Sequence, residues 1–187
     1  MRKRKGFQKP CETLKVNKEQ VLRIIDSMAK KGTIVCPASE GDTSDVLKLW
    51  ALFEKEDERV QPEFLSLSRN FKRELRKYAS DLGRRGDSTF IVAKVNGRCI
   101  GFANVRIENY PKIFKKAKIG SVNDLFIMPK YRKSGVGSRV LKCAENWLKS
   151  KRVRYILLQA SSRLDWLSRM YEDRGYNEYE KSYFKKI

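Results

Sequence analysis

Residues 124–138 constrain this chain more than any other stretch of its sequence. An apolar run typical of a strand meets Pro129, and a basic loop with Gly135 and Gly137 leads into an amphipathic helix pattern. Glycine leaves the neighbouring backbone N–H groups uncovered, and the start of a helix adds the positive end of its dipole. A strand, a loop and a helix in this order therefore predict a cradle for an anion such as a phosphate group.

The residues of this loop exclude two common phosphate-binding motifs. A Walker loop needs Gly-x-x-x-x-Gly-Lys-Ser/Thr, which the sequence lacks. A dinucleotide fingerprint needs a third glycine where this chain has Val140, and it opens the first strand-to-helix turn of its domain instead of following a hairpin. What remains is Arg132-Lys-Ser-Gly-Val-Gly137, a basic residue followed by a Gly-x-Gly pair.

Hydrophobic periodicity along the chain predicts one mixed α/β domain. The Asn96-Gly97 pair between two β-rich runs predicts a type I′ hairpin, because both residues tolerate positive φ angles. The expected order is β-α-α-β-β-β-α-β-α-β in a domain over 32–187, preceded by a basic arm and a short helix over 1–31. Strands are expected at residues 33–36, 89–95, 98–106, 121–128, 155–160 and 179–185, and helices at 19–31, from 42 or 43 onward, 62–82, 138–150 and 165–173.

The charge of the chain suggests two alternatives for its partners. It has 42 Lys and Arg against 22 Asp and Glu, a net charge of +20. Such a surface predicts weak binding to polyanions, including nucleic acid and ribosomes. The same composition also fits a basic cytosolic enzyme with no polyanionic partner.

Residue types missing from the sequence exclude several kinds of chemistry. The chain has no His, which excludes Ser-His-Asp and Cys-His catalysis and His-ligated metals. Its four Cys form no Cys-x-x-Cys pair, so neither a zinc knuckle nor any other metal site is expected. No apolar stretch is long enough to span a membrane and no apolar signal core is present, so we expect a cytoplasmic protein.

Two motifs resemble the signatures of the GNAT acyl-CoA N-acyltransferase superfamily. The Arg132–Gly137 loop, with a strand before it and a helix after it, resembles the first. Met170-Tyr-Glu-Asp-Arg-Gly-Tyr176 resembles the second, which is written Phe-Tyr-Glu-Lys-x-Gly-Phe. The resemblance covers about residues 33–187 and implies a mostly antiparallel, twisted sheet flanked by helices.

The resemblance implies an acyl-CoA co-substrate, which is acetyl-CoA or another acyl-CoA. Backbone amides at 133–138 would hold its pyrophosphate, and the strand over 125–128 would splay from its neighbour and pair with the pantetheine arm. Strand alternation places Phe126 and Met128 on one face and Leu125 and Ile127 on the other. The implied cofactor-binding residues are Phe126, Ile127, Met128, Arg132, Lys133, Ser134, Gly135, Val136, Gly137 and Ser138.

The implied reaction is direct attack of an amine on the thioester. Tyr171 matches the family tyrosine that supplies a proton to the leaving thiolate. For the base, Asp124 is the first choice and Glu108 the second. Leu164 stands where the family often has an Asn that contacts the pantetheine, and Leu167 stands where it often has an Ala. The helix that carries Tyr171 is therefore expected to contribute less to cofactor binding.

The acceptor is the least determined part of the site. Glu54, Glu56, Asp57 and Glu58 form an acidic run in a basic protein, and a negative patch there would attract a cationic amine. A protein N-terminus or lysine, a polyamine and a small amine all remain open. A competing hypothesis is a nucleic-acid- or ribosome-associated protein with a vestigial cofactor site, and both a monomer and a homodimer are compatible with the sequence.

Overall fold

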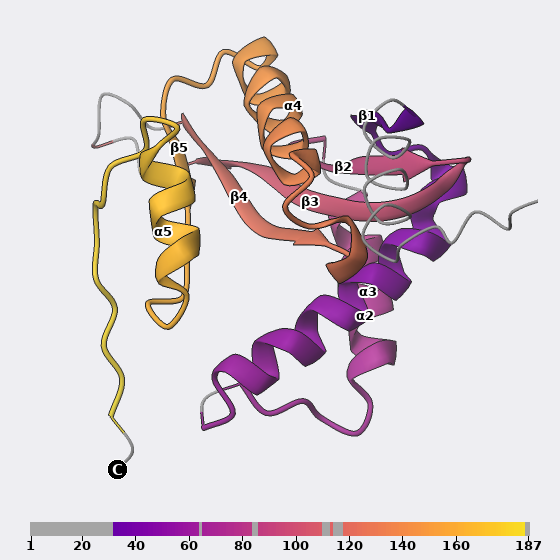
Figure 1. The fold of residues 1–187 in the computed structure, drawn as a ribbon, viewed down its shortest axis with the longest axis horizontal. Coiled ribbons are helices and arrows are strands. Elements are labelled where there is room, and N and C mark those ends of the chain that lie inside the picture. Colours follow the sequence, from indigo (N-terminus) through magenta and orange to yellow (C-terminus); the bar gives the residue numbers. More distant parts are fainter. Residues whose placement is uncertain (1–31, 64, 84–85, 110–112, 114–117, 186–187) are drawn as a thin grey trace, which may run out of the picture.

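The computed structural model describes residues 32–63, 65–83, 86–109, 113 and 118–185 (Figure 1). The elements follow in the order β1, α2, α3, β2, β3, β4, α4, β5 and α5. They span, in that order, Ile34–Pro37, Thr43–Val60, Phe71–Gly83, Ser88–Val95, Arg98–Asn109, Lys118–Ile127, Val136–Ser150, Ile156–Leu158 and Asp165–Glu172. The predicted arm and helix over 1–31 lie outside the described residues.

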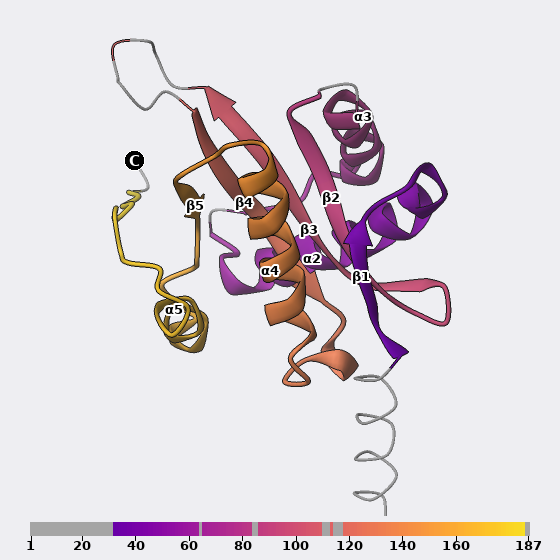
Figure 2. The same cartoon turned by 90° about the horizontal axis from the view of Figure 1, so that it is seen from above.

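The strands form a mixed, mostly antiparallel sheet, as predicted. Its order is β1-β2-β3-β4-β5, with antiparallel neighbours from β1 to β4 and a parallel β4-β5 pair. Helix α4 covers one face of the sheet, and α2 and α3 cover the opposite face, as Figure 2 shows from above. Because the central strand β3 is covered on both faces, every residue from Cys99 to Val105 is buried.

The β2–β3 hairpin confirms the prediction made from Asn96-Gly97. Their φ angles are 49° and 76°, within the left-handed region that a type I′ turn requires. Val95 and Arg98 face each other directly, so the turn has two residues and fixes the register of the hairpin.

Two hydrophobic clusters, one on each face, hold the sheet to its helices. On the α2 side, Trp50 packs its ring 5.3 Å from that of Phe90 and 6.0 Å from that of Phe102, between ring centroids. Trp50 and Phe53 thus serve the core. On the other side, helix α4 buries a stripe of residues at helical spacing, namely Val136, Val140, Leu141, Ala144 and Leu148.

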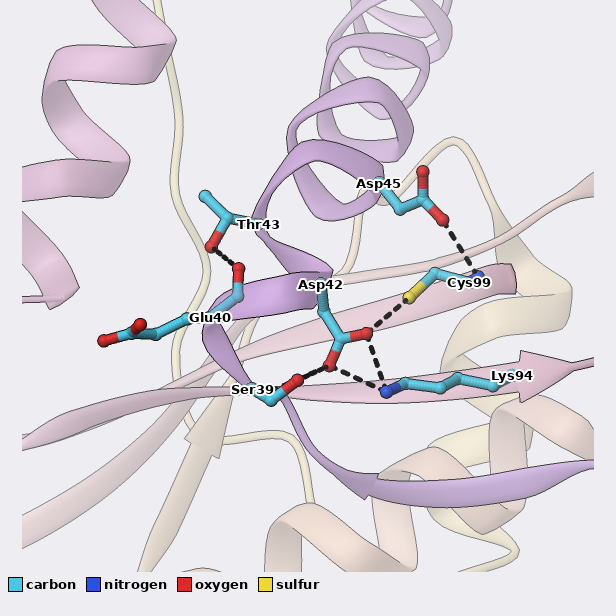
Figure 3. Close-up of polar contacts among 7 residues, drawn as sticks. All are labelled: Ser39, Glu40, Asp42, Thr43, Asp45, Lys94 and Cys99. Carbon is cyan, nitrogen blue, oxygen red and sulfur yellow. Dashed lines mark hydrogen bonds and ion pairs between the residues drawn. The ribbon is translucent and has the colours of Figure 1, made fainter. Parts of the chain in front are cut away.

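A buried polar cluster fixes the start of α2 to the β2–β3 hairpin (Figure 3). The Asp42 carboxylate accepts hydrogen bonds from the Ser39 backbone N–H and hydroxyl, both at 2.8 Å, and lies 2.6 Å from the Lys94 ammonium. Burial alone would raise the pKa of Asp42, but the contacts with Lys94 and Ser39 lower it to about 2. Burial and the nearby carboxylates raise the pKa of Cys99 to about 11, so its thiol stays protonated.

The predicted helix beginning at Pro62 is wrong at its start. Helix α2 continues to Val60, and α3 begins only at Phe71. A proline disfavours helical geometry in the residue before it, and Gln61 leaves the helix with φ −133° and ψ 56°. Between the helices the Glu58 carboxylate accepts a hydrogen bond of 2.9 Å from the Leu67 N–H, which fixes a non-helical path.

The predicted final strand at 179–185 is also wrong. Residues 176–185 carry no strand and run away from the sheet beyond α5 (Figure 1). Tyr179 and Tyr183 are 81% and 88% exposed. The sheet ends at β5, which is only three residues long, and offers little edge for a further strand to pair with.

Candidate active site

The loop between β4 and α4 has the backbone shape of an anion cradle. After a 3-10 turn at Pro129–Tyr131, the chain adopts left-handed φ angles at Lys133 (59°) and Gly135 (83°). Such changes of hand turn successive N–H groups into one concavity. Gly135 is the N-cap of α4, and the helix supplies no acceptor for the first N–H groups that follow. The predicted phosphate loop therefore opens α4.

Two side chains of this loop serve its own structure. Arg132 donates from Nε to the Ile127 carbonyl at 2.7 Å and from Nη2 to the Glu56 carboxylate at 2.6 Å. Ser134 is buried and donates its hydroxyl to the Tyr131 carbonyl at 2.6 Å. Arg132 thus ties the loop to β4 and α2, and Ser134 closes the turn. These contacts leave the main chain of the loop and the exposed Lys133 side chain available to a ligand.

Strand β4 separates from β5 at a bulge. Asp124 lies opposite Asn104 and Val122 opposite Val105, so Asn123 is an extra residue that bends the strand. The parallel ladder with β5 ends at the Val122–Leu158 pair. From residue 124 to 127, β4 therefore has a hydrogen-bonding partner strand only on the β3 side among the described residues.

The main chain of Leu125 and Ile127 faces this open edge. The Met128 N–H donates to the Ile100 carbonyl of β3 at 2.9 Å, and successive residues of a strand point to opposite edges. The side chains follow the predicted alternation, because Phe126 packs with the α2 cluster while Leu125 and Ile127 pack with the α4 cluster. A ligand along this edge would therefore contact backbone groups.

Tyr171 lies on α5 and is buried, with 6% of its surface exposed. Its ring centroid is 5.9 Å from that of Tyr176. Burial raises the pKa of Tyr171 to about 12, although the positive charge of Arg174 opposes the rise. Among the described residues none hydrogen-bonds its hydroxyl. The phenol is thus fully protonated near neutral pH and has a proton to donate.

Asp124 is held by a polar chain that crosses the sheet. Its carboxylate accepts a 2.7 Å hydrogen bond from Asn104 Nδ2. Arg106 contacts the Asn104 side-chain oxygen at 3.4 Å and donates to the Tyr78 hydroxyl at 2.6 Å. Burial raises the pKa of Asp124, and the contacts with Asn104 and Arg106 only partly oppose that rise. A carboxylate with a raised pKa accepts a proton more readily near neutrality.

Asn104 is a site residue that the sequence analysis missed. It is 1% exposed in the middle of the apolar strand β3. A buried amide needs hydrogen-bond partners, and Asn104 finds them in Asp124 and Arg106. The signal was the asparagine itself, which interrupts an otherwise apolar run in a predicted strand.

The acidic run of α2 divides into two pairs. Glu56 binds Arg132, and Glu58 caps the Leu67 N–H, so these two carboxylates have structural partners. Burial raises the pKa of Glu54, and the negative charges of Asp124 and Asp57 raise it further. Burial also raises the pKa of Asp57. The structure thus brings Glu54 and Asp57 into electrostatic contact with Asp124.

Glu108, the second candidate base, lies apart from this group. It is exposed near the end of β3 and accepts a 2.7 Å hydrogen bond from the Ser121 hydroxyl. It lies four residues along the strand from Asn104, roughly 13 Å at the usual rise per residue. The geometry therefore favours Asp124.

The turn before α5 is tied to the end of α2. Arg163 donates to the Val60 carbonyl at 2.8 Å and pairs with the Glu63 carboxylate. Leu164 and Leu167 contribute apolar side chains here, and Leu167 packs against the α4 cluster. The pantetheine contacts often made by family residues at these two positions have no polar equivalent in this chain.

The anion cradle at the start of α4, the open edge of β4 and the buried phenol of Tyr171 suit an enzyme that binds a phosphate-bearing acyl donor. The chain belongs to the Acetyltransferase (GNAT) family, whose sequence profile matches residues 49–176. This match confirms the resemblance drawn from the two signatures.

Similar proteins agree with this assignment. The chain is 30% identical over 73 residues to an uncharacterized N-acetyltransferase of Archaeoglobus fulgidus, a match to 39% of this chain and 49% of that protein. It is 30% identical over 94 residues to the uncharacterized N-acetyltransferase YhfO of Bacillus subtilis, covering 49% and 60%. The chain thus spans about half the length of these relatives. Its fold is similar to that of the aminoglycoside N-acetyltransferase AAC(6')-Iy in complex with CoA, with a TM-score of 0.65, 15% identity and coverage of 83% and 94%.

Two further observations concern the described residues alone. No helix in this part of the chain combines the length and the apolar character needed to cross a membrane. The same residues contain no group of three or more Cys, Asp or Glu side chains placed to hold a metal ion.

Proposed function

We propose that this chain transfers an acetyl group from acetyl-CoA to a primary amine by direct attack of the amine on the thioester. The observation that carries the proposal is the unpaired stretch of β4, which runs from Asp124 toward the cradle at the start of α4. An extended ligand with an anionic end suits this strand edge, because it finds main-chain partners along the strand and N–H donors at the helix start.

The residues present fit acetyl-CoA along this strand edge. The backbone amides at 133–138 would bind the pyrophosphate. The main chain of Leu125 and the N–H of Ile127, whose carbonyl already accepts from Arg132, would pair with the pantetheine arm. Acetyl-CoA, when bound, supplies the acyl group as a thioester. Arg132 acts by holding the cradle against β4 and α2, as its contacts with Ile127 and Glu56 indicate.

Two side chains, the buried Tyr171 and the half-buried Asp124, would handle the protons of the reaction. Tyr171, protonated because of its raised pKa, donates to the leaving thiolate. Asp124, the base, accepts a proton from the bound ammonium, and the neutral amine that results attacks the thioester. For an α-amine with a pKa of about 8, deprotonation at pH 7 costs about 1.4 kcal/mol, and for a lysine amine about 4.6 kcal/mol. The second acceptor would depend far more on the raised pKa of Asp124.

The carboxylates beside Asp124 support a cationic acceptor. Glu54 and Asp57 each have a raised pKa, which means that their charged forms are disfavoured where they lie. A bound ammonium would offset the cost of burying these carboxylates in their charged form and would reduce their mutual repulsion. Whether that ammonium belongs to a protein, a polyamine or an aminoglycoside is the question for an acceptor screen.

The remaining expectations are part of the same proposal. Residues 32–187 would form the catalytic domain, with 1–31 as a basic arm and a short helix. The enzyme would act in the cytoplasm as a monomer or homodimer. A basic surface of +20 net charge would add weak, salt-sensitive binding to polyanions.

Calorimetry with acetyl-CoA tests the donor half. The wild type should release heat, and Gly135→Asp should not, because the substitution puts a negative charge and a strained φ of 83° at the cradle. Gly86→Asp is the matched control, since a side chain there meets nothing within 4 Å. Wild-type protein that binds no acetyl-CoA would refute the proposal. Thiol release across peptides, polyamines and aminoglycosides would then identify the acceptor.

A further inference from the structure

An arginine just beyond the end of α5 reaches across to the first turn of α4. Arg174 donates from Nη1 to the Met170 carbonyl at 2.5 Å, and from Nη2 to the Ser138 hydroxyl. Met170 belongs to α5, and Ser138 lies three residues after the glycine that begins α4. One side chain therefore bridges the cradle helix and the helix that carries Tyr171.

The position of Arg174 matters because of what would lie between these helices. The proposed cofactor path runs from Tyr171 along the open edge of β4 to the cradle. Arg174 follows Tyr171 by one helical turn, and its charge acts on the Tyr171 phenol. Since it also touches Ser138 in the cradle, it extends along the path from the reacting end toward the phosphate end.

Both acceptors of Arg174 are neutral, so the positive charge of its guanidinium has no anionic partner among the described residues. They are a carbonyl and a hydroxyl, and no carboxylate among the described residues forms an ion pair with this guanidinium. A guanidinium forms stronger bonds with anionic oxygens than with neutral ones, and its fork geometry matches phosphate. A pyrophosphate oxygen is thus a better partner for Nη2 than the Ser138 hydroxyl.

We propose, on the basis of the proposed function, that Arg174 is a cofactor-binding residue whose guanidinium exchanges the Ser138 hydroxyl for a pyrophosphate oxygen of acyl-CoA. The bond to the Met170 carbonyl anchors the side chain during this exchange. The same helix then contributes an ionic contact to cofactor binding, where Leu164 and Leu167 contribute no polar one.

The test compares a ligand that carries the pyrophosphate with one that lacks it together with the rest of the nucleotide. Calorimetry measures the dissociation constants of CoA and of S-acetylpantetheine, which lacks the nucleotide and its phosphates, for the wild type and for Arg174→Gln. Glutamine keeps hydrogen-bonding capacity but loses the charge. We expect the CoA constant to rise about 10- to 100-fold, the range for a lost hydrogen bond to a charged group, and the acetylpantetheine constant to stay within about twofold.

Arg169→Gln is the matched control, because Arg169 is an exposed arginine of the same helix and its loss changes the net charge equally. It should leave both constants within about twofold of the wild type. Arg174→Gln with wild-type affinity for CoA would overturn the proposal. Equal weakening of both ligands would also overturn it, since it would indicate a purely structural role at the end of α5. A wild type that binds no CoA would refute the proposed function itself.

Discussion

Replacing Asp42 with Asn tests the polar cluster that fixes α2 to the sheet. The side chains of Asp42 and Lys94 are only 9% and 20% exposed, and their charged atoms lie 2.6 Å apart. Asparagine keeps the shape of the side chain but removes its charge, so Lys94 would lose its anionic partner. We expect Asp42→Asn to destabilise the fold without touching the proposed cofactor path.

The lowered pKa of Asp42 sets the size of this effect. A fall from 3.8 to about 2 corresponds to about 2.4 kcal/mol of folding free energy at neutral pH. Because the pKa is lower in the folded state, the contribution is complete well above pH 3.8 and is lost as the pH falls toward 2. Linkage gives about 2.4 kcal/mol near pH 6 and about 1.3 kcal/mol near pH 3. The raised pKa of Lys94 reflects the same ion pair and adds nothing further.

Urea unfolding of the wild type and Asp42→Asn at both pH values measures the difference. Glu40→Gln is the control, since Glu40 is exposed and its carboxylate points away from the cluster (Figure 3). The destabilisation by Asp42→Asn should shrink by about half between pH 6 and pH 3, while Glu40→Gln should cost less than about 0.5 kcal/mol at both. An equal loss at the two pH values would refute the electrostatic account.

Two other substitutions test the active-site region. Tyr171→Phe should lower the maximal rate by about 10²- to 10⁴-fold and leave the affinity for acetyl-CoA unchanged, because it removes only a proton donor; a wild-type rate would exclude Tyr171 from the mechanism. Gly101→Ala places a Cβ 2.4 Å from Ile127 Cδ1 and 2.7 Å from the Phe126 carbonyl, so β3 and β4 must separate. Its stability in urea should fall by about 1–3 kcal/mol, whereas Gly41→Ala, with only Ser39 Oγ at 3.8 Å, should be far milder.

Much of the fold could be predicted because its signals are local. The Asn96-Gly97 turn and the glycine that opens α4 each depend on the φ angles of one or two residues. The wrong predictions of secondary structure have the opposite origin, because they depend on neighbouring elements of the fold. The apolar spacing after Pro62 fits a helix equally well, and only the continuation of α2 to Val60 makes Pro62 a terminator.

The missed site residues depend on tertiary contacts. Asn104 acquires its role when β4 places Asp124 opposite it in the sheet. Arg174 stands at the variable position of the second signature, and only its approach to Ser138 distinguishes it from any other exposed arginine. Nothing within five residues of either one predicts these partners.

The acidic run shows why the proposed acceptor side was harder to predict than the proposed donor side. Four carboxylates that are close in sequence point in different directions, because a helix turns about 100° per residue and only residues three or four apart share a face. Glu54 and Asp57 share one, beside Asp124, while Glu56 and Glu58 meet Arg132 and the Leu67 N–H instead. Counting all four carboxylates therefore overstates the negative charge of the patch beside Asp124 by two. The cradle is one contiguous loop, whereas the proposed acceptor side joins α2, β3 and β4 across 70 residues. The charge of the proposed acceptor side therefore follows from the packing of the sheet rather than from any single segment.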